Sequence, residues 1–169
     1  MDYSKHKWIA GWINHFPANY WKLRKIVIDK NNHTPIFIKY FYLLIIKRAD
    51  AFNHCSFGTN INSGAIINTP PVMPHGPAGI IIGYNTRIEE NVTIFQRVTI
   101  NHTNGKGVHV CKNAFLGAGC VILGDVTIGE GAKIGANAVV LSDIPPFSTA
   151  VGVPARIVIK KSVSTRKCS

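Results

Sequence analysis

The sequence has few acidic residues and no apolar run long enough to cross a membrane. Eight Asp and Glu stand against 19 Lys and Arg, which gives a formal net charge of +11. The longest apolar run, residues 36–46, is about half of the roughly 20 residues that a membrane-spanning helix needs, and it contains Lys39. Because 46% of the residues are hydrophobic and only 16% are charged, the composition also excludes a disordered chain.

The N-terminus lacks the apolar block and small-residue cleavage site of a signal peptide. The four cysteines, at positions 55, 111, 120 and 168, form no CxxC pair and no regular framework. We therefore expect reduced thiols in a cytoplasmic protein, lying at the inner face of the cell membrane if its basic end contacts lipid.

The positive charge is concentrated at the two ends of the chain. Residues 1–54 hold nine Lys or Arg against three Asp, and residues 155–169 hold five bases and no acid. Such ends suit cofactor phosphates, acidic lipid headgroups or nucleic acid, or they are simply a solvated surface. No helix-turn-helix, aromatic RNA platform or zinc finger is present, so we expect no nucleic-acid partner.

A period of six residues is the strongest pattern in the sequence. Aliphatic residues recur at every sixth position, and the residue four places later is usually small or branched. Period six fits neither a helix nor an isolated strand, but it is typical of short parallel strands joined by tight corners around a narrow interior. We predict a mainly β fold, a parallel β-helix of hexapeptide repeats over residues 55–159 with three sides and three hexads to each coil. The repeat positions are Ile82, Ile88, Ile94, Ile100, Val110, Leu116, Ile122, Ile128, Ile134 and Val140.

The repeat loses its phase once, because Ile100 and Val110 are ten residues apart. The intervening stretch is polar and contains glycine, so we predict a protruding loop at residues 101–109.

Different segments flank the repeats. Residues 1–54 are predicted to be a helical N-terminal segment, basic and aromatic, with helices at 20–29 and 35–51, the second having Thr34 as N-cap and Pro35 at its first position. Residues 1–50 either cap the first coil or contact a membrane surface. Residues 160–169 form a basic C-terminal tail.

Residues 60–159 resemble the serine acetyltransferase branch of the hexapeptide acyltransferases. The resemblance implies a left-handed coil, an exception to the usual right-handed crossover. It further implies a homotrimer with its active site between neighbouring subunits, acetyl-CoA as co-substrate and no metal. The segments that carry it are MPHGPAGIIIG, RIEENVTIFQRVTI, FLGAGCVILGDVTIGEGAKIGANAVVLSDIPP and VGVPARIV.

The resemblance also assigns roles to individual residues. It makes His75, in PHGPAG, the general base, and an imidazole with a pKa of roughly 6.5 suits that task near neutral pH. Gly117 and Ala118 lie one coil before Gly135 and Ala136, and these positions are expected to hold the pantetheine arm of CoA. The phosphates would be met by Arg156 and Lys160, and the acceptor by Asn101, His102 and Lys106.

Three features depart from true serine acetyltransferases. Asn60 stands where the family has an aspartate that orients the base, Lys106-Gly107 stands where it has Arg-His, and the segment that precedes the coil is short. The short, basic, aromatic N-terminal segment and the PHGPAG element instead resemble the acetyltransferases of bacterial exopolysaccharide, capsule and O-antigen synthesis. This resemblance implies a carbohydrate acceptor, a sugar hydroxyl of bacterial surface polysaccharide synthesis. The alternatives are serine O-acetylation for cysteine biosynthesis, or a trimeric coil module that binds CoA without turnover.

A zinc carbonic anhydrase on the same coil is a further alternative. It requires three histidines at one interface, with two of them about five residues apart. His102 and His109 are seven apart, and His75 lies more than one coil before His102, so the spacing does not favour this function.

Overall fold

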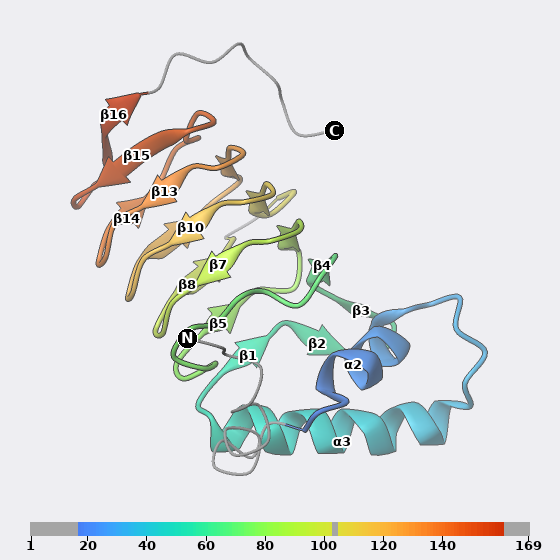
Figure 1. Cartoon of the computed structure of the whole chain (residues 1–169). Helices are drawn as coiled ribbons and strands as arrows, with labels where there is room; N and C mark the ends of the chain where they lie inside the picture. Colours follow the sequence, from blue (N-terminus) through green and yellow to red (C-terminus); the bar gives the residue numbers. More distant parts are fainter. Residues whose placement is uncertain (1–16, 103–104, 161–169) are drawn as a thin grey trace.

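Two helices lie across one end of a stack of short strands (Figure 1). The computed structural model of the chain describes residues 17–102 and 105–160, with side chains as far as Val158. The helices are α2 (Tyr20–Ile28) and α3 (Ile36–Phe52). Among the described residues, neither helix is long and apolar enough to cross a membrane.

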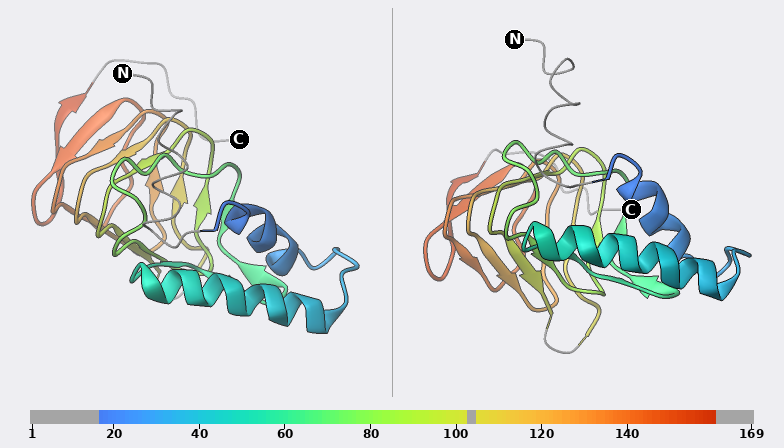
Figure 2. Two further views of the ribbon diagram at one scale, coloured as in Figure 1. Left: turned by 60° about the horizontal axis from the view of Figure 1, so that its bottom comes forward. Right: turned by 90° about the horizontal axis from the view of Figure 1, so that it is seen from below.

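The strands form three sheets that make the sides of a triangular prism, and neighbouring strands of a sheet belong to successive coils (Figure 2). All pairings within the stack are parallel, except that the last strand runs antiparallel to the one before it. The prediction of a parallel β-helix is therefore confirmed. Sheet 1 contains β1 (Ser56–Phe57), β5 (Ile81–Ile82), β8 (Thr99–Asn101), β11 (Val121–Leu123) and β14 (Val139–Val140); sheet 2 contains β4 (Ile66–Ile67), β6 (Arg87–Ile88), β9 (His109–Val110) and β12 (Thr127–Ile128); sheet 3 contains β7 (Thr93–Ile94), β10 (Phe115–Leu116), β13 (Lys133–Ile134), β15 (Ser148–Val151) and β16 (Arg156–Lys160). A small antiparallel pair, β2 (Thr59–Asn60) and β3 (Ser63–Gly64), lies beside the first coil.

The ten aliphatic repeat positions form the core of the prism. Each of them is at most 1% exposed. Their stacking follows from strand register, since Ile82 pairs with Ile100, Ile100 with Ile122, and Ile122 with Val140. Burying such a side chain contributes on the order of 2 kcal/mol, so this column supplies much of the stability of the fold.

The register of the paired strands also gives the number of residues inserted where the repeat loses its phase. Residues paired between β5 and β8 are three hexads apart, as in Ile82 and Ile100, whereas those paired between β8 and β11 are four residues further apart, as in Ile100 and Ile122. The four additional residues therefore leave the coil at the corner between β8 and β9. This corner joins sheet 1 to sheet 2, and we call it the loop edge.

The corner that joins sheet 3 to sheet 1 is built from residues in the left-handed backbone conformation. One such residue occurs in every coil, with φ between 51° and 69°. This conformation is unfavourable for residues with a Cβ atom, so the tight corner is maintained by the strand pairing on either side of it. We call this corner the groove edge; its left-handed residues are His54, Gly79, Arg97, Gly119 and Asn137.

The start of α3 differs from the prediction. The N-cap residue is Pro35, and no side chain caps the helix. Thr34 is instead held by its own N–H, which donates to Asn32 Oδ1 at 2.9 Å. This local turn keeps Thr34 one residue outside the cap position that its sequence pattern suggested.

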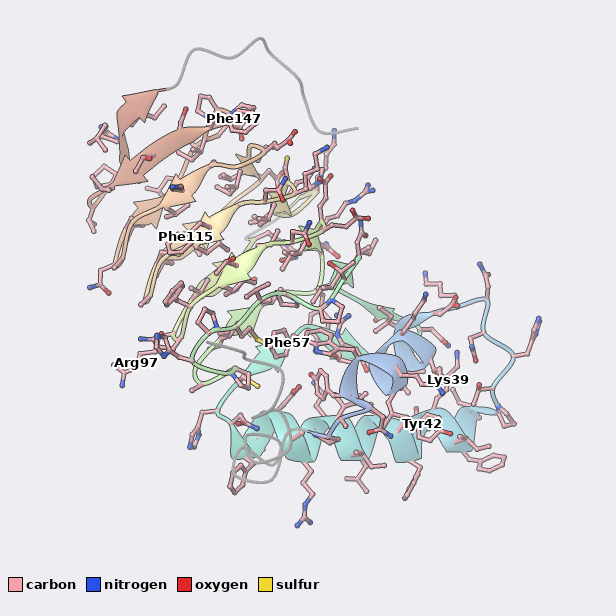
Figure 3. The ribbon with its side chains drawn as sticks, viewed as in Figure 1. Lys39, Tyr42, Phe57, Arg97, Phe115 and Phe147 are labelled. Carbon is pink, nitrogen blue, oxygen red and sulfur yellow. The ribbon has the colours of Figure 1, made fainter. Side chains whose placement is uncertain are left out.

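Arg24 of α2 joins the helices to the first coil. It is only 2% exposed, and its Nη2 donates to the carbonyl oxygens of Phe57 at 2.7 Å and Ala65 at 2.6 Å, while Nε donates to Thr59 Oγ1 at 3.0 Å. Burial lowers the pKa of Arg24 to about 10, so the guanidinium is still charged at neutral pH. Phe57, which is fully buried, lies between these helices and the coil (Figure 3).

Asp50 of α3 is a second buried charged residue at the same junction. The Tyr20 hydroxyl donates to Asp50 Oδ1 at 2.6 Å, and Asp50 Oδ2 is buried with no hydrogen-bond partner among the described residues. Burial raises the pKa of Asp50 above its ordinary value, although the Tyr20 hydrogen bond, Lys47 and Arg24 oppose the shift.

The cysteines are only partly as expected. Cys55 and Cys120 are buried free thiols, and burial raises the pKa of each to about 12. Cys111 is disulfide-bonded. The expectation of four reduced thiols is therefore wrong for Cys111, since regular spacing, on which that expectation depended, does not report which cysteines approach each other in the fold.

Replacing Arg24 by leucine should lower the free energy of unfolding by about 3 kcal/mol, because buried carbonyl groups lose their charged donor. Lys25→Leu, at the neighbouring exposed position, should change it by less than about 0.5 kcal/mol. Urea unfolding of both variants checks this. Equal effects would show that the Arg24 hydrogen bonds do not stabilise the junction.

The raised pKa of Asp50 predicts a pH dependence. Above pH ~4 the unfolded state loses its Asp50 proton before the folded state does, so the free energy of unfolding falls as pH rises toward the folded pKa. Asp50→Asn keeps the side-chain volume and the Tyr20 hydrogen bond but cannot ionise. Urea unfolding from pH 4 to 7 should show this fall in the unsubstituted protein and a smaller one in Asp50→Asn; identical profiles would contradict the assignment.

Candidate functional site

A groove of about 570 Å³ runs along the groove edge of the prism. It crosses successive coils at their corners, and five of its ten lining residues are glycine or alanine. Its floor is therefore shaped for an extended ligand that lies along the stack. The lining residues are Asn53, His54, Ala78, Gly79, Gln96, Arg97, Ala118, Gly119, Ala136 and Asn137.

Two of the predicted cofactor-binding residues, Ala118 and Ala136, line this groove one coil apart. The Asn137 N–H donates to the Ala118 carbonyl at 2.9 Å, which holds the two corners together. Among the described residues, no hydrogen bond uses the backbone N–H of Ala118 or of Ala136. Two amide donors about 4.8 Å apart, each beside a methyl side chain, are thus available to carbonyl groups of a bound ligand.

The other two predicted residues of this set, Gly117 and Gly135, have packing roles in the structure. A Cβ atom on Gly117 would lie 2.7 Å from the Ala136 nitrogen and the Ile134 carbonyl oxygen, and one on Gly135 would lie 2.7 Å from Val151 Cγ1. Neither glycine lines the groove. They allow neighbouring coils to approach, and in this way they set the positions of Ala118 and Ala136.

His75 lies beside the groove on the side of sheet 3. Val72 forms a parallel bridge with Thr93, which places His75 one coil before Phe95 and Gln96. The exposed imidazole lies against Phe95, with 5.5 Å between ring centroids, and Phe95 lies 5.1 Å from Phe115. The structure therefore places a solvent-accessible base next to the groove wall formed by Ala78, Gly79 and Gln96.

Asn60, the residue expected to orient His75, has a different partner. It is exposed on β2, and its Oδ1 accepts a hydrogen bond from the Ile61 N–H at 2.9 Å. Within residues 17–102 and 105–158, no side-chain hydrogen bond joins Asn60 to His75. In this conformation the orienting contact of His75 is the ring of Phe95.

The predicted acceptor residues Asn101, His102 and Lys106 lie on the loop edge, a different corner of the prism from the groove. Asp125 fastens this loop, because its Oδ1 accepts the Gly107 N–H at 2.9 Å. The N–H groups of Gly107 and Lys106 lower the pKa of this exposed carboxyl. One copy of the chain therefore does not bring these three residues together with His75.

The C-terminal strand starts at one end of the groove. The Ala155 N–H donates to the Val139 carbonyl at 2.8 Å, so Arg156 follows close to the Ala136 corner. Arg156 is exposed, and its Nη1 donates to the adjacent Ala155 carbonyl at 3.1 Å. The side chain of Lys160 lies outside the described residues, and its role stays a prediction.

Arg97 is a groove residue that the sequence reasoning missed. It extends outward from the corner (Figure 3) and is exposed, although its backbone φ is 59°. The spacing contained the signal, since Arg97 lies one regular coil after Gly79 and one coil lengthened by the loop before Gly119.

Glu89, His109 and Cys111 place ligand-type atoms within 4.8 Å of one another on the outside of sheet 2. The Glu89 oxygens already accept from His109 Nε2 at 2.9 Å and from the Lys112 N–H at 2.9 Å, and Cys111 is disulfide-bonded. The donor set is therefore engaged within the protein and does not fit a metal centre.

Comparison with known proteins agrees with the repeat architecture. Residues 107–142 match the model of the bacterial transferase hexapeptide (six repeats). Serine acetyltransferase of Bacillus subtilis (strain 168) is 39% identical over 132 residues, which are 76% of this chain and 59% of that protein. Serine acetyltransferase of Buchnera aphidicola subsp. Schizaphis graminum (strain Sg) is 43% identical over 116 residues, which are 66% and 44% respectively.

Solved structures give the same result. A serine acetyltransferase in complex with CoA has a TM-score of 0.60 at 36% identity, covering 72% of this chain and 49% of that one. Soybean serine acetyltransferase complexed with serine has a TM-score of 0.60 at 36% identity, covering 71% and 49%. The expected left-handed β-helix is confirmed by this likeness. The chain spans about half the length of these proteins.

By these findings the chain is similar to the hexapeptide-repeat acyltransferases and, over its coil, to the serine acetyltransferases among them.

The expectation of a carbohydrate acceptor in polysaccharide synthesis is wrong by this comparison, because the matching relatives are serine acetyltransferases at 39% and 43% identity. That expectation depended on the resemblance to polysaccharide acetyltransferases and on three departures: Asn60, Lys106-Gly107 and the short segment before the coil. The structure shows why Asn60 is a weak guide, because its side chain accepts a hydrogen bond from the adjacent Ile61 N–H.

Proposed function

We propose that the chain is an acetyl-CoA-dependent serine O-acetyltransferase that works as a homotrimer. The observation that carries the proposal is the groove edge, where two available amide donors one coil apart lie beside the exposed imidazole of His75. Acetyltransferase activity and the use of acetyl-CoA are supported by the names of the relatives and by the CoA complex of a similar protein.

The groove fits the pantetheine arm of CoA. This arm is extended and carries amide carbonyl groups, and the Ala118 and Ala136 N–H groups are donors with the spacing of successive coils. Arg97 at the groove and Arg156 at its C-terminal end are exposed guanidinium groups that suit phosphate. The two methyl side chains leave the groove floor open, whereas larger ones would fill it.

His75 is the proposed general base. It removes the proton from the serine hydroxyl as the oxygen attacks the thioester carbon. The new C–O bond forms, the C–S bond breaks, and the departing thiolate takes the proton from the imidazolium. The tilted ring contact of His75 with Phe95, which itself contacts Phe115, holds the imidazole at the wall of the groove.

Trimerisation would complete the acceptor side of the site. In one chain the groove edge and the loop edge are separate corners of the prism, so the acceptor-binding loop cannot serve its own His75. In a three-fold assembly of prisms side by side, the loop edge of one copy faces the groove edge of the next. Asn101, His102 and Lys106 of one subunit would then contact serine held at His75 of its neighbour.

His75→Ala should lower the serine-dependent release of CoA thiol from acetyl-CoA by at least about 100-fold. His33→Ala, at an exposed position beyond α2, is the matched control and should retain activity. A thiol-reactive dye with and without serine gives the rates. Retained turnover in His75→Ala would contradict its role, and an inactive unsubstituted protein that binds CoA tightly would indicate a binding module.

Ala136→Phe tests the groove itself. The ring should fill the corner and raise the Kd for CoA by more than about 10-fold, with an unchanged Tm because Ala136 is exposed. Asn113→Phe, at an exposed corner on the third edge of the prism, should leave binding unchanged. Calorimetric titration with CoA checks both variants. Equal affinities of Ala136→Phe and Asn113→Phe for CoA would show that CoA does not bind in this groove.

A further inference from the structure

The outer face of α3 carries large apolar side chains that are exposed. Its exposed side chains follow the i, i+4, i+7 spacing of one helix face, as in Phe37, Phe41 and Leu44. A surface of this size and composition on one helix marks an interaction site. The exposed fractions are Ile36 53%, Phe37 71%, Tyr40 60%, Phe41 60%, Leu44 65% and Phe52 54%.

The opposite face of the same helix packs against the rest of the protein. Ile46, Ala49 and Asp50 are buried there. The Lys39 ammonium is also buried, donating to the Asp29 carbonyl at 2.7 Å and to Asn62 Oδ1 at 2.8 Å. Tyr42, Leu43 and Ile45 pack against the core as well, and Figure 3 shows other side chains of α3 pointing away from the coils. Both sides of the helix therefore carry apolar side chains, and among the described residues it is the inner side that is packed.

Positive charge predominates among the exposed groups of the helical segment that carries the apolar face. Between residues 17 and 54 the exposed charged groups are one acid, Asp29, and five bases. The two buried bases of this segment, Arg24 and Lys39, have their own partners. The exposed bases are Lys22, Lys25, Lys30, Lys47 and Arg48.

We propose that the outer face of α3 docks this protein on an anionic lipid surface. An interfacial helix inserts aromatic and aliphatic side chains at the boundary of headgroups and acyl chains, while flanking Lys and Arg meet lipid phosphates. Phe37, Phe41 and Leu44 supply the inserted face, Tyr40 supplies an amphipathic ring, and Lys47 and Arg48 lie one turn further along the helix.

The positive charge near the outer face of α3 favours an anionic lipid surface over a second copy of this chain as its partner. Two copies meeting through the same face would bring two sets of exposed bases together with one acid each, and like charges repel. An anionic bilayer complements both the apolar stripe and the bases. Because α3 is not long and apolar enough to cross a bilayer, the contact is one that lies along the surface.

Docking in this way has a defined geometry. α3 crosses the N-terminal end of the coil stack (Figure 1), and the groove begins immediately after it, at Asn53 and His54. A membrane under α3 would leave the sides of the prism in solvent. The inference goes beyond the proposed function and does not depend on it.

Vesicle co-sedimentation tests the proposal. The full chain should sediment with vesicles made of two parts phosphatidylcholine and one part phosphatidylglycerol, and it should remain in solution with pure phosphatidylcholine. Leu44→Asp should weaken binding to the anionic vesicles more than 10-fold, whereas Leu141→Asp, a leucine 58% exposed on the coil, should not. Lys47→Glu should weaken it several-fold and Lys133→Glu, exposed on β13, should not.

Three results would overturn the proposal: equal binding to both vesicle types, equal effects of Leu44→Asp and Leu141→Asp, or no binding to vesicles together with a smaller particle mass in Leu44→Asp. The last result would show that this face joins copies of the chain. Light scattering of every variant gives the mass, and CoA thiol release measured without vesicles reports the proposed function separately.

Discussion

The column of aliphatic side chains inside the prism is the interaction on which the rest of the structure depends. Each repeat position buries one Ile, Val or Leu against the residue of the coil above and below. Parallel pairing then repeats at every coil, because a slip would expose the aliphatic side chain and bury an outward one. The corners, which carry the chemistry, inherit their spacing from this column.

The groove edge shows how such a core positions function. The corner residues adopt a conformation that isolated peptides avoid, and they do so in five successive coils. Among the described residues, the amides of Ala118 and Ala136 at these corners take no part in the hydrogen bonds between coils. Gly117 and Gly135 contribute indirectly, since their missing Cβ atoms let the coils approach.

The sequence predicted the features that follow the six-residue repeat, but it did not predict contacts made by single side chains. All ten repeat positions are buried, and the break in phase lies where register shows four additional residues. The contacts of Arg24 and Asp50 join distant segments by single side chains, and no period reports them. Arg97 has the same spacing as the other groove-edge residues, but it is large, whereas Gly79 and Gly119 at the neighbouring corners are small. The acceptor was misjudged because Asn60 was weighed as a motif position, whereas its side chain is hydrogen-bonded to the adjacent Ile61 N–H.

The spacing between coils also determines the length of the groove. Its wall passes through five corners, from His54 to Asn137. Successive corners are about 4.8 Å apart, so the length of the groove is about 19 Å. A gain or loss of one coil would change that length by one step and leave every other corner unaltered. The length of ligand that this fold can hold along its side is therefore encoded as a number of repeats, independently of which side chains the corners carry.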